Sequence, residues 1–383
     1  MAVVADTLDN QSALPVSAAL CVDREAFDRF GRVLRHLLVG LIDQAVKLRL
    51  VSSDPRVEKL TLGPVQTVVH ERIGWPMTRR RIDQLVDVLS YQPPTLVHAL
   101  SSASYKIGIT IAEAFDADIA LQVTSVADCD AIANLKTEPR PLGSGPTVKP
   151  ARRFLALSRP LVTMLEEQLK IPAEWVDLIH PGVLTSQRIA CFADAKRTPT
   201  ILCLSALERG SRVDRLIEAV DLVRKRDHTV LLFLLGQGRQ ESALRRMIRE
   251  RKLSSCVTLA HPAGDPSQAM HSADIFVRPS ADTAFTTDGL QAMGAGMAVV
   301  TFPNTVCDYL HHGETAVICE KPTAESLANT LEQLLTDRAG AQRIATTAIE
   351  YVRTHHAVSG MAERTANAYR KLALARATFS IKE

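Results

Sequence analysis

The sequence predicts an α/β protein built from two doubly wound domains in tandem, each with a parallel sheet covered by helices on both faces. Short apolar runs of the kind found in buried parallel strands alternate with helical patterns of about ten or more residues. This alternation breaks once, near 184–198, and then begins again. The 383 residues of the chain are more than one typical core contains and enough for two.

The first series of elements follows a stretch, 1–14, that we expect to be a disordered leader. Its first strand is expected at 16–22, and Asp23 directly after it can cap a long helix. Residues 130–150 are rich in Pro and Gly and predict a loop. The other expected elements are strands at 46–52, 65–71, 95–101, 117–125 and 152–158, and helices at 80–92, 104–115 and 159–169.

The second series begins at residue 199 and repeats the alternation of strands and helices. We therefore predict Rossmann-like domains at 15–184 and 185–358, followed by a C-terminal helical segment at 359–383. The expected elements are strands at 199–205, 229–236, 256–260, 273–280, 297–302 and 315–320, and helices at 211–226, 239–252, 266–272, 288–295 and 323–336.

The composition excludes several classes of protein. A net charge of +3 indicates no general affinity for nucleic acid or for an anionic membrane. The seven cysteines include no C-x-x-C pair, which favours buried, reduced thiols over disulfides or a zinc site. No apolar run approaches the length of a membrane span, and the first residues do not resemble a signal peptide. We expect a cytoplasmic protein without a metal.

Three loops of the second series follow the carboxyl ends of strands, where ligands bind in open parallel sheets. They are 204–212, 235–240 and 278–289. In the second loop Gly236 and Gly238 allow close approach of a ligand, although a plain tight turn also explains a lone G-x-G. In the third, the backbone N–H groups at the start of the next helix suit a phosphate. These three loops predict a ligand site facing a cleft between the two domains.

Several motifs of the second half also resemble a known family. In order, they are "GQG" after an apolar strand, "ADIFVRPS", "LQAMGAGMAVVTF", "HHGETAVI" and "AESLANTLEQLL". Together they resemble the C-terminal domain of GT-B glycosyltransferases, specifically the retaining group 1 type, also called family 4. "TLVHALS" and "FLALSRPLVTMLEEQLKIPAEWVDLIHPGV" resemble the N-terminal domain more weakly. The resemblance covers most of 90–370 and implies GT-B architecture.

The resemblance implies that a sugar nucleotide lies against the second domain, yet the catalytic motifs are eroded. Two family glutamates that hold the donor sugar and the ribose correspond to Thr283 and Gln291. The Arg and Lys that neutralise the leaving diphosphate correspond to Ala206 and Ser211. The N-terminal domain also lacks the family's glycine-rich loop and its catalytic histidine. The positions that keep the family pattern are Gly236, Gly238, the backbone donors around Phe285, Thr286 and Thr287, and Asp308 in place of a glutamate.

Other residues near these loops have two interpretations each. Arg209, Arg212 and Arg278 can replace the missing phosphate ligands or be ordinary surface arginines. Asp288 is better explained as a helix-starting residue than as a sugar contact, and Asp282 is a second acid near the cleft. His98 ends a strand, where a packed or hydrogen-bonded histidine is favoured over a catalytic base.

The family also returns its last helix to the N-terminal domain. We expect the same of 359–376, where Met361, Thr365, Ala368 and Leu372 form a weak apolar stripe.

Two functions remain open from the sequence. The first is a retaining hexosyltransferase that moves a sugar from a nucleoside-diphosphate sugar to a glycan, lipid or small-molecule acceptor, without a metal. The second is a non-catalytic homologue that binds a partner such as an active glycosyltransferase. A sugar-nucleotide epimerase is a more distant alternative, because the paired acids that it needs are missing.

Overall fold

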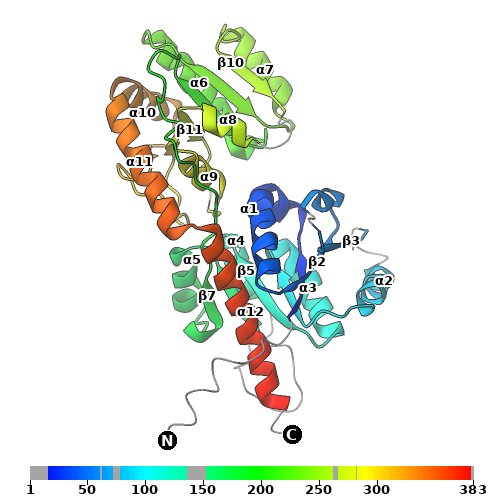
Figure 1. Ribbon diagram of the computed structural model, residues 1–383. Coiled ribbons are helices and arrows are strands. Elements are labelled where there is room, and N and C mark those ends of the chain that lie inside the picture. Colours follow the sequence, from blue (N-terminus) through cyan, green and yellow to red (C-terminus); the bar gives the residue numbers. More distant parts are fainter. Residues whose placement is uncertain are drawn as a thin grey trace, which may run out of the picture. The chain divides into compact units, whose positions relative to one another are not determined.

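The computed structural model describes residues 16–60, 63–71, 78–135, 152–261, 266–281 and 283–380. The expected leader and Asp282 lie outside these residues. The chain forms two compact units (Figure 1). The first unit comprises the described residues up to Gly182 together with those from Val358 onward. The second unit is Val183–Ala357.

The first unit contains a seven-stranded sheet in the order β3-β2-β1-β4-β5-β6-β7, and all of its paired strands are parallel. The order reverses between β1 and β4, which is the switch point of a doubly wound sheet. The strands are β1 (Ser17–Cys21), β2 (Lys47–Ser52), β3 (Gln66–Val69), β4 (Leu96–Ala99), β5 (Asp118–Val123), β6 (Arg152–Ala156) and β7 (Val176–Leu178).

The helices of the first unit begin with α1, which Asp23 caps as predicted. The carboxylate of Asp23 accepts hydrogen bonds from the N–H groups of Glu25 at 2.8 Å and Ala26 at 3.0 Å. The helices are α1 (Arg24–Asp43), α2 (Thr78–Ser90), α3 (Ser102–Ala114), α4 (Val126–Asn134), α5 (Arg159–Thr163) and α12 (Val358–Ser380). A π-helical turn at Met164–Gln168 continues α5, and 3-10 turns lie at Pro55–Leu60 and Ala173–Trp175.

The last helix, α12, packs against α1, β5 and β6 of the first unit. Its contact with α1 is tight at one point, because a Cβ added to Gly40 would overlap the Cβ of Ala362. The four apolar-stripe residues are all buried: Met361, Thr365, Ala368 and Leu372.

The second unit contains a six-stranded parallel sheet in the order β10-β9-β8-β11-β12-β13. Its strands are β8 (Thr200–Leu204), β9 (Leu231–Leu235), β10 (Val257–Ala260), β11 (Ile275–Arg278), β12 (Ala298–Thr301) and β13 (Val317–Ile318). Its helices are α6 (Val213–Lys225), α7 (Glu241–Glu250), α8 (Ser267–Ser272), α9 (Asp288–Gly294), α10 (Ala324–Thr336) and α11 (Arg338–His355), with a 3-10 turn at Arg209–Ser211.

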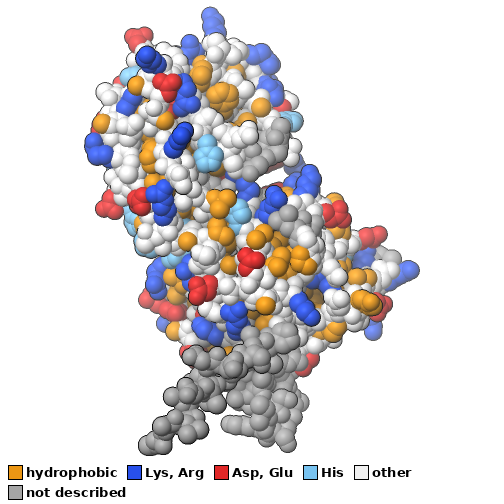
Figure 2. All heavy atoms as spheres, viewed as in Figure 1, with side chains coloured by type: hydrophobic (Ala, Val, Ile, Leu, Met, Phe, Trp, Pro, Cys, Tyr) orange, Lys and Arg blue, Asp and Glu red, His pale blue; other side chains and the backbone are white. Residues whose placement is uncertain are grey.

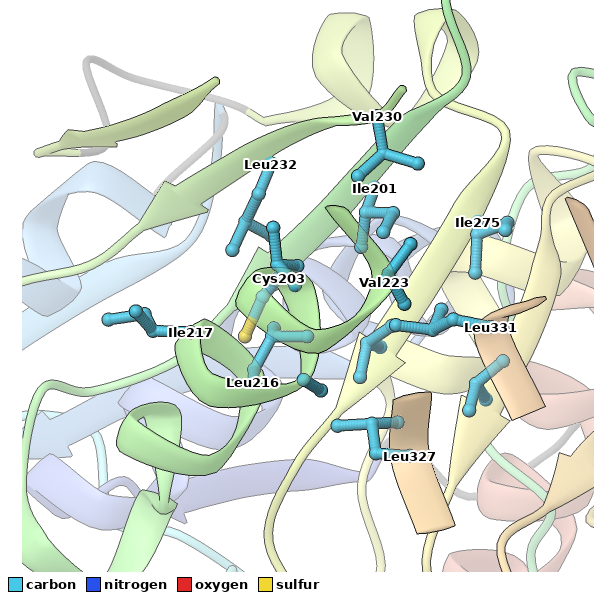
Figure 3. Packing of buried hydrophobic residues seen from close by; sticks show 14 of the residues in the cluster. Ile201, Cys203, Leu216, Ile217, Val223, Val230, Leu232, Ile275, Leu327 and Leu331 are labelled. Atoms are coloured by element: carbon cyan, nitrogen blue, oxygen red, sulfur yellow. The ribbon is translucent and has the colours of Figure 1, made fainter. Parts of the chain in front are cut away.

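The core of the second unit forms where α6 and α10 cover the sheet. Ile201 of β8 and Leu232 of β9 are fully buried, as are Leu216 of α6 and Leu331 of α10 (Figure 3). Both units therefore confirm the predicted pair of doubly wound α/β sheets.

Two predicted details are wrong. The loop expected at 130–150 begins with helix, because α4 continues to Asn134; residues 136–150 lie outside the described residues. The prediction also omitted α11, whose buried positions are mostly alanines.

The distribution of surface charge and the state of the cysteines agree with what the composition predicted. In the view of Figure 2, acidic and basic side chains are interspersed. All seven cysteines are free and buried, as predicted. Burial raises the pKa of Cys21 and Cys203 to about 12, so these thiols stay protonated at neutral pH.

Two kinds of feature are absent from the described residues. No helix among them combines the length and the hydrophobicity that a bilayer crossing requires. Within the same ranges, no group of three or more His, Cys, Asp or Glu side chains is arranged to hold a metal ion.

Candidate nucleotide-sugar site

The three predicted loops of the second unit lie at one edge of its sheet. They leave the carboxyl ends of β9, β8 and β11, which are neighbours in the sheet. Because these strands are parallel, their carboxyl ends share an edge. The structure therefore brings together the loops that carry Arg209 and Arg212, Gly236 and Gly238, and the segment after Arg278.

Gly236 and Gly238 are required by the packing of two loops on each other. A Cβ on Gly236 would overlap the carbonyl oxygen of Ser205, and one on Gly238 would lie 2.5 Å from that of Leu207. The N–H of Leu207 also donates to the carbonyl of Gln237 at 2.9 Å. The close approach predicted from the G-x-G pattern thus occurs between two segments of the protein itself.

The two arginines of the first loop line a cavity of about 340 Å³ with Glu208, Asp214 and Gln240. Arg209 is exposed and has no acidic partner among the described residues. Arg212 binds Asp214 through two hydrogen bonds, from Nε at 3.2 Å and from Nη2 at 3.1 Å. A bidentate pair of this kind is the geometry that an arginine would otherwise offer to a phosphate.

Neither position that corresponds to a family cation offers a side chain to an anion. Ala206 is exposed and carries no donor. The hydroxyl of Ser211 donates to the carbonyl of Glu208 at 2.6 Å and so closes the turn before α6. The Glu208 carboxylate accepts the N–H of Arg239 at 3.2 Å, which ties this loop to the glycine loop.

Arg278 lies at the end of β11 and is mostly buried. Its Nη1 is 3.8 Å from the carboxylate of Asp288, and the two side chains are 22% and 29% exposed. Asp288 is the first residue of α9, as predicted. Arg278 thus brings a guanidinium to the sheet edge, where Asp288 is one of its partners.

The segment before α9 is fixed by hydrogen bonds to its carbonyl groups. The hydroxyl of Tyr309 donates to the carbonyl of Thr286 at 2.8 Å, and the side-chain amide of Asn304 donates to that of Ala284 at 3.0 Å. Phe285 is fully buried with its ring edge-on to Tyr309, at 5.5 Å between ring centres. In the described part of the chain, the N–H groups of Phe285 and Thr286 have no acceptor. This segment therefore has rigid geometry and two available donors.

The other predicted positions near this segment are less well placed to contact a ligand. Thr283 is exposed, and its side chain is two heavy atoms shorter than the glutamate of the family. Gln291 donates from Nε2 to the hydroxyl of the buried Thr287 at 3.1 Å, within the first turns of α9. Asp308 accepts the hydroxyl of Tyr351 on its backbone carbonyl at 3.4 Å. The helix α9 has seven residues, so its dipole adds little for an anion.

In the first unit, the corresponding edge of the sheet is closed by its own side chains. Asp128 is buried and accepts the N–H groups of Ser102 and Thr124, each at 2.8 Å. His98 is buried with Nδ1 2.7 Å from the hydroxyl of Tyr369 on α12, which confirms the packed, hydrogen-bonded interpretation. Burial lowers the pKa of His98 to about 3, so the ring is neutral at physiological pH.

Comparison with known proteins agrees with the second unit's sequence motifs. Residues 198–337 match the family model of the group 1 glycosyl transferases. The second unit contains a group 1 glycosyltransferase domain. A curated relative from Mycobacterium tuberculosis, a GDP-mannose-dependent alpha-(1-6)-phosphatidylinositol monomannoside mannosyltransferase, is 26% identical over 204 residues. This match covers 47% of the chain and spans about half of the relative, 52% of its length.

Solved structures show that this chain has the GT-B fold over nearly its whole length. Anabaena Alr3699/HepE in complex with UDP-glucose superposes with a TM-score of 0.72 at 15% identity, covering 92% of this chain and 98% of that one. Sucrose-phosphate synthase from Thermosynechococcus elongatus superposes with a TM-score of 0.72 at 17% identity, covering 94% and 100%. At these identities the likeness concerns the fold.

Sequence reasoning missed three residues that shape the candidate site. Asp214 binds the guanidinium of Arg212, and Glu208 connects the first loop to the glycine loop. Tyr309 fixes the segment before α9 by its hydrogen bond to the carbonyl of Thr286. Only Asp214 left a signal in the sequence, since it follows Arg212 by two residues at the start of a helix.

Proposed function

We propose that this protein transfers a hexose from a nucleoside-diphosphate sugar to a glycan, lipid or small-molecule acceptor, with retention of the anomeric configuration. The observation that carries the proposal is the fixed segment before α9, in which the N–H groups of Phe285 and Thr286 have no acceptor among the described residues. This segment follows β11, whose last residue is Arg278. Backbone donors held in place suit the oxygens of a diphosphate. The buried thiols fit a reducing compartment such as the cytoplasm.

The leaving diphosphate needs more positive charge than Arg278 supplies. Removing one preorganised stabiliser of developing charge typically slows an enzyme about 10²- to 10³-fold. Arg209 has no acidic partner among the described residues and is the first candidate to contribute. Arg212 contributes only if its bidentate contact moves from Asp214 to phosphate. Gln291 can accept a ribose hydroxyl through its amide oxygen, because only its Nε2 is engaged.

A thermal-shift and calorimetric titration with UDP, GDP and their sugars tests this proposal. We expect a nucleoside diphosphate to raise Tm, Arg278→Ala to weaken binding about tenfold, and the double change Arg209→Ala with Arg212→Ala to weaken it further. Arg246→Ala is the control, because Arg246 is an exposed arginine on α7 whose ion-pair partner is Glu250. Absence of any shift at millimolar nucleotide would contradict the proposal.

Turnover and stereochemistry need separate measurements. A protein that binds the nucleotide should release nucleoside diphosphate from a sugar nucleotide when an acceptor is supplied. The product sugar should keep the anomeric configuration of the donor, which proton NMR coupling constants report. An inverted product would exclude the retaining mechanism while leaving the transferase intact.

A second candidate function is a non-catalytic glycosyltransferase homologue that binds a partner, such as an active glycosyltransferase. It is favoured by the Arg212–Asp214 pair and by the absence of a cation at Ala206 and Ser211. The double change Ser211→Lys with Ala206→Arg separates the two candidates. If the wild type binds no nucleotide and this variant does, the site retains its shape without its chemistry, and the non-catalytic function is supported.

A further inference from the structure

A second depression lies in the first unit, between β7 and α12, with a volume of about 580 Å³. One wall is the end of β7 around Asp177 and Leu178, and the other is α12. Arg364, Asn367 and Lys371 line it from α12 at spacings of three and four residues, so they share one face of the helix. The volume is in the range of small-molecule sites.

Arg364 has an unusual environment for a cation. Its Nε and Nη2 are buried, and no acceptor among the described residues contacts them. The guanidinium lies against Gly360, where an added Cβ would be 3.3 Å from Nη1. Burial lowers the pKa of this side chain. Nε and Nη2 form the edge of a guanidinium that grips two oxygens of one phosphate.

The other two cations of the depression differ in their partners, which are neutral for Arg370 and acidic for Lys371. Arg370 is fixed by neutral acceptors, the backbone and side-chain oxygens of Gln44 at 3.2 and 3.0 Å and the Oδ1 of Asn367 at 2.9 Å. Lys371 lies 2.9 Å from Oδ1 of Asp177, whose other oxygen takes Nε of Arg153 at 2.5 Å.

The charge of this cluster is positive. Among the residues that line the depression, Asp177 is the acid, against the cations Arg364, Arg370 and Lys371. Arg153 also binds Asp177, and the exposed Glu363 lies near Arg364. A dianion with several oxygens matches this surplus better than a single carboxylate does.

We propose that the depression between β7 and α12 binds a phosphomonoester group, gripped by Arg364 and held by Arg370 and Lys371. Rotation about the side-chain torsions of Arg364 brings its two unsatisfied nitrogens to the phosphate oxygens. Leu178 and Leu374 offer apolar contact to the rest of the ligand. This site uses residues of the first unit alone and does not depend on the proposed glycosyl transfer.

Calorimetric titration of the full-length protein with inorganic phosphate and with glycerol 3-phosphate tests the site. We expect saturable binding, weakened about tenfold or more by Arg364→Ala. Arg364→Lys should lose part of the affinity, since it keeps the charge and loses the paired donors. Arg246→Ala should bind like the wild type. Circular dichroism and Tm of each variant verify that it is folded.

The phosphate can come from a free metabolite or from a lipid headgroup, and a second arm of the experiment separates these sources. Sedimentation with phosphatidylcholine vesicles, with and without phosphatidic acid, reports the lipid form. Binding of the free phosphomonoester alone indicates a metabolite. Sedimentation with phosphatidic acid that free phosphate reverses indicates a headgroup. No binding in either arm, or undiminished binding by folded Arg364→Ala, overturns the proposal.

Discussion

The two units contain the same kind of parallel sheet but differ at its carboxyl edge. In the first unit, acids of the chain take the backbone donors: Asp23 caps α1, and Asp128 binds the N–H groups after β4 and β5. In the second unit, the segment before α9 keeps two N–H groups without an acceptor among the described residues, next to Arg278. Of the two carboxyl edges, that of the second unit therefore offers the backbone donors that the proposed diphosphate needs.

The first unit also lacks the glycine-rich loop that the resemblance implied, and Asp23 stands in that region. The start of a helix as long as α1 attracts anions, but here the Asp23 carboxylate already occupies it. An external phosphate would have to displace that carboxylate. The cap itself stabilises α1 by about 1 kcal/mol.

The largest expected effect comes from the contact that builds the second unit's edge. Gly236→Ala should lower the free energy of unfolding by about 3 kcal/mol, since the new Cβ overlaps the carbonyl of Ser205. Gly210→Ala is the matched control in the same loop region, with nothing within 4 Å of the added Cβ. Urea denaturation measures both. If the two variants are equally stable, the 204–212 loop can shift to accommodate the added Cβ, and this edge of the sheet is not rigid.

The second prediction concerns the closed edge of the first unit. His98 stays neutral in the folded protein down to about pH 3, whereas the unfolded histidine protonates below about pH 6.5. The contribution of neutral His98 to the free energy of unfolding is therefore fully present above pH 6.5. Below that pH it falls by about 1.4 kcal/mol per pH unit, or by about 2 kcal/mol at pH 5. His98→Gln should lack this part of the pH slope in urea denaturation, while His271→Gln, on the exposed side of α8, should keep it. Identical slopes in wild type and His98→Gln would refute the neutral, buried state.

A smaller effect is expected when the segment before α9 loses the hydrogen bond that Tyr309 donates to it. Tyr309→Phe removes the hydrogen bond to the carbonyl of Thr286 and should cost about 1 kcal/mol of stability. It should also weaken nucleotide binding, because the N–H groups of the segment lose their fixed position. Tyr351→Phe is the control, since its hydroxyl makes only a 3.4 Å contact with the carbonyl of Asp308. A Tyr309→Phe variant that binds nucleotide like the wild type would mean that the segment needs no support.

The smallest effect tests whether Arg212 is available. Asp214→Ala removes a partner that is 46% exposed, so stability should change by no more than about 0.5 kcal/mol. Affinity for a nucleoside diphosphate should rise about threefold, because the guanidinium is released. Glu250→Ala releases Arg246 on α7 in the same way and should leave nucleotide affinity unchanged. If Asp214→Ala does not strengthen binding, Arg212 does not reach the phosphates.

The sequence was sufficient for most of the fold, because the strands are short apolar runs and many helices carry a clear apolar face. It failed for α11, where small residues such as Ala341 and Ala345 supply the buried face and give little periodic contrast. It also missed α4 as a whole, because that helix has only nine residues and runs directly into a Pro- and Gly-rich stretch.

The site was less predictable because it depends on the orientation of individual side chains and on the partners that they bind. The pattern G-x-G reports close backbone approach, but it does not distinguish a ligand from the carbonyls of Ser205 and Leu207. Arg212 has a left-handed backbone conformation, with φ at 51°, and its guanidinium is bound to Asp214. Neither feature is visible in a list of charged residues.

The division of the first unit along the chain has a consequence for biosynthesis. As the polypeptide leaves the ribosome, β1 to β7 emerge before the second unit, and α12 emerges after it. The second unit can finish folding while the first still lacks the helix that covers Gly40 and binds His98 through Tyr369. A nascent chain therefore exposes an unfinished apolar surface on its earliest part for most of translation, and this is the surface that chaperones would meet.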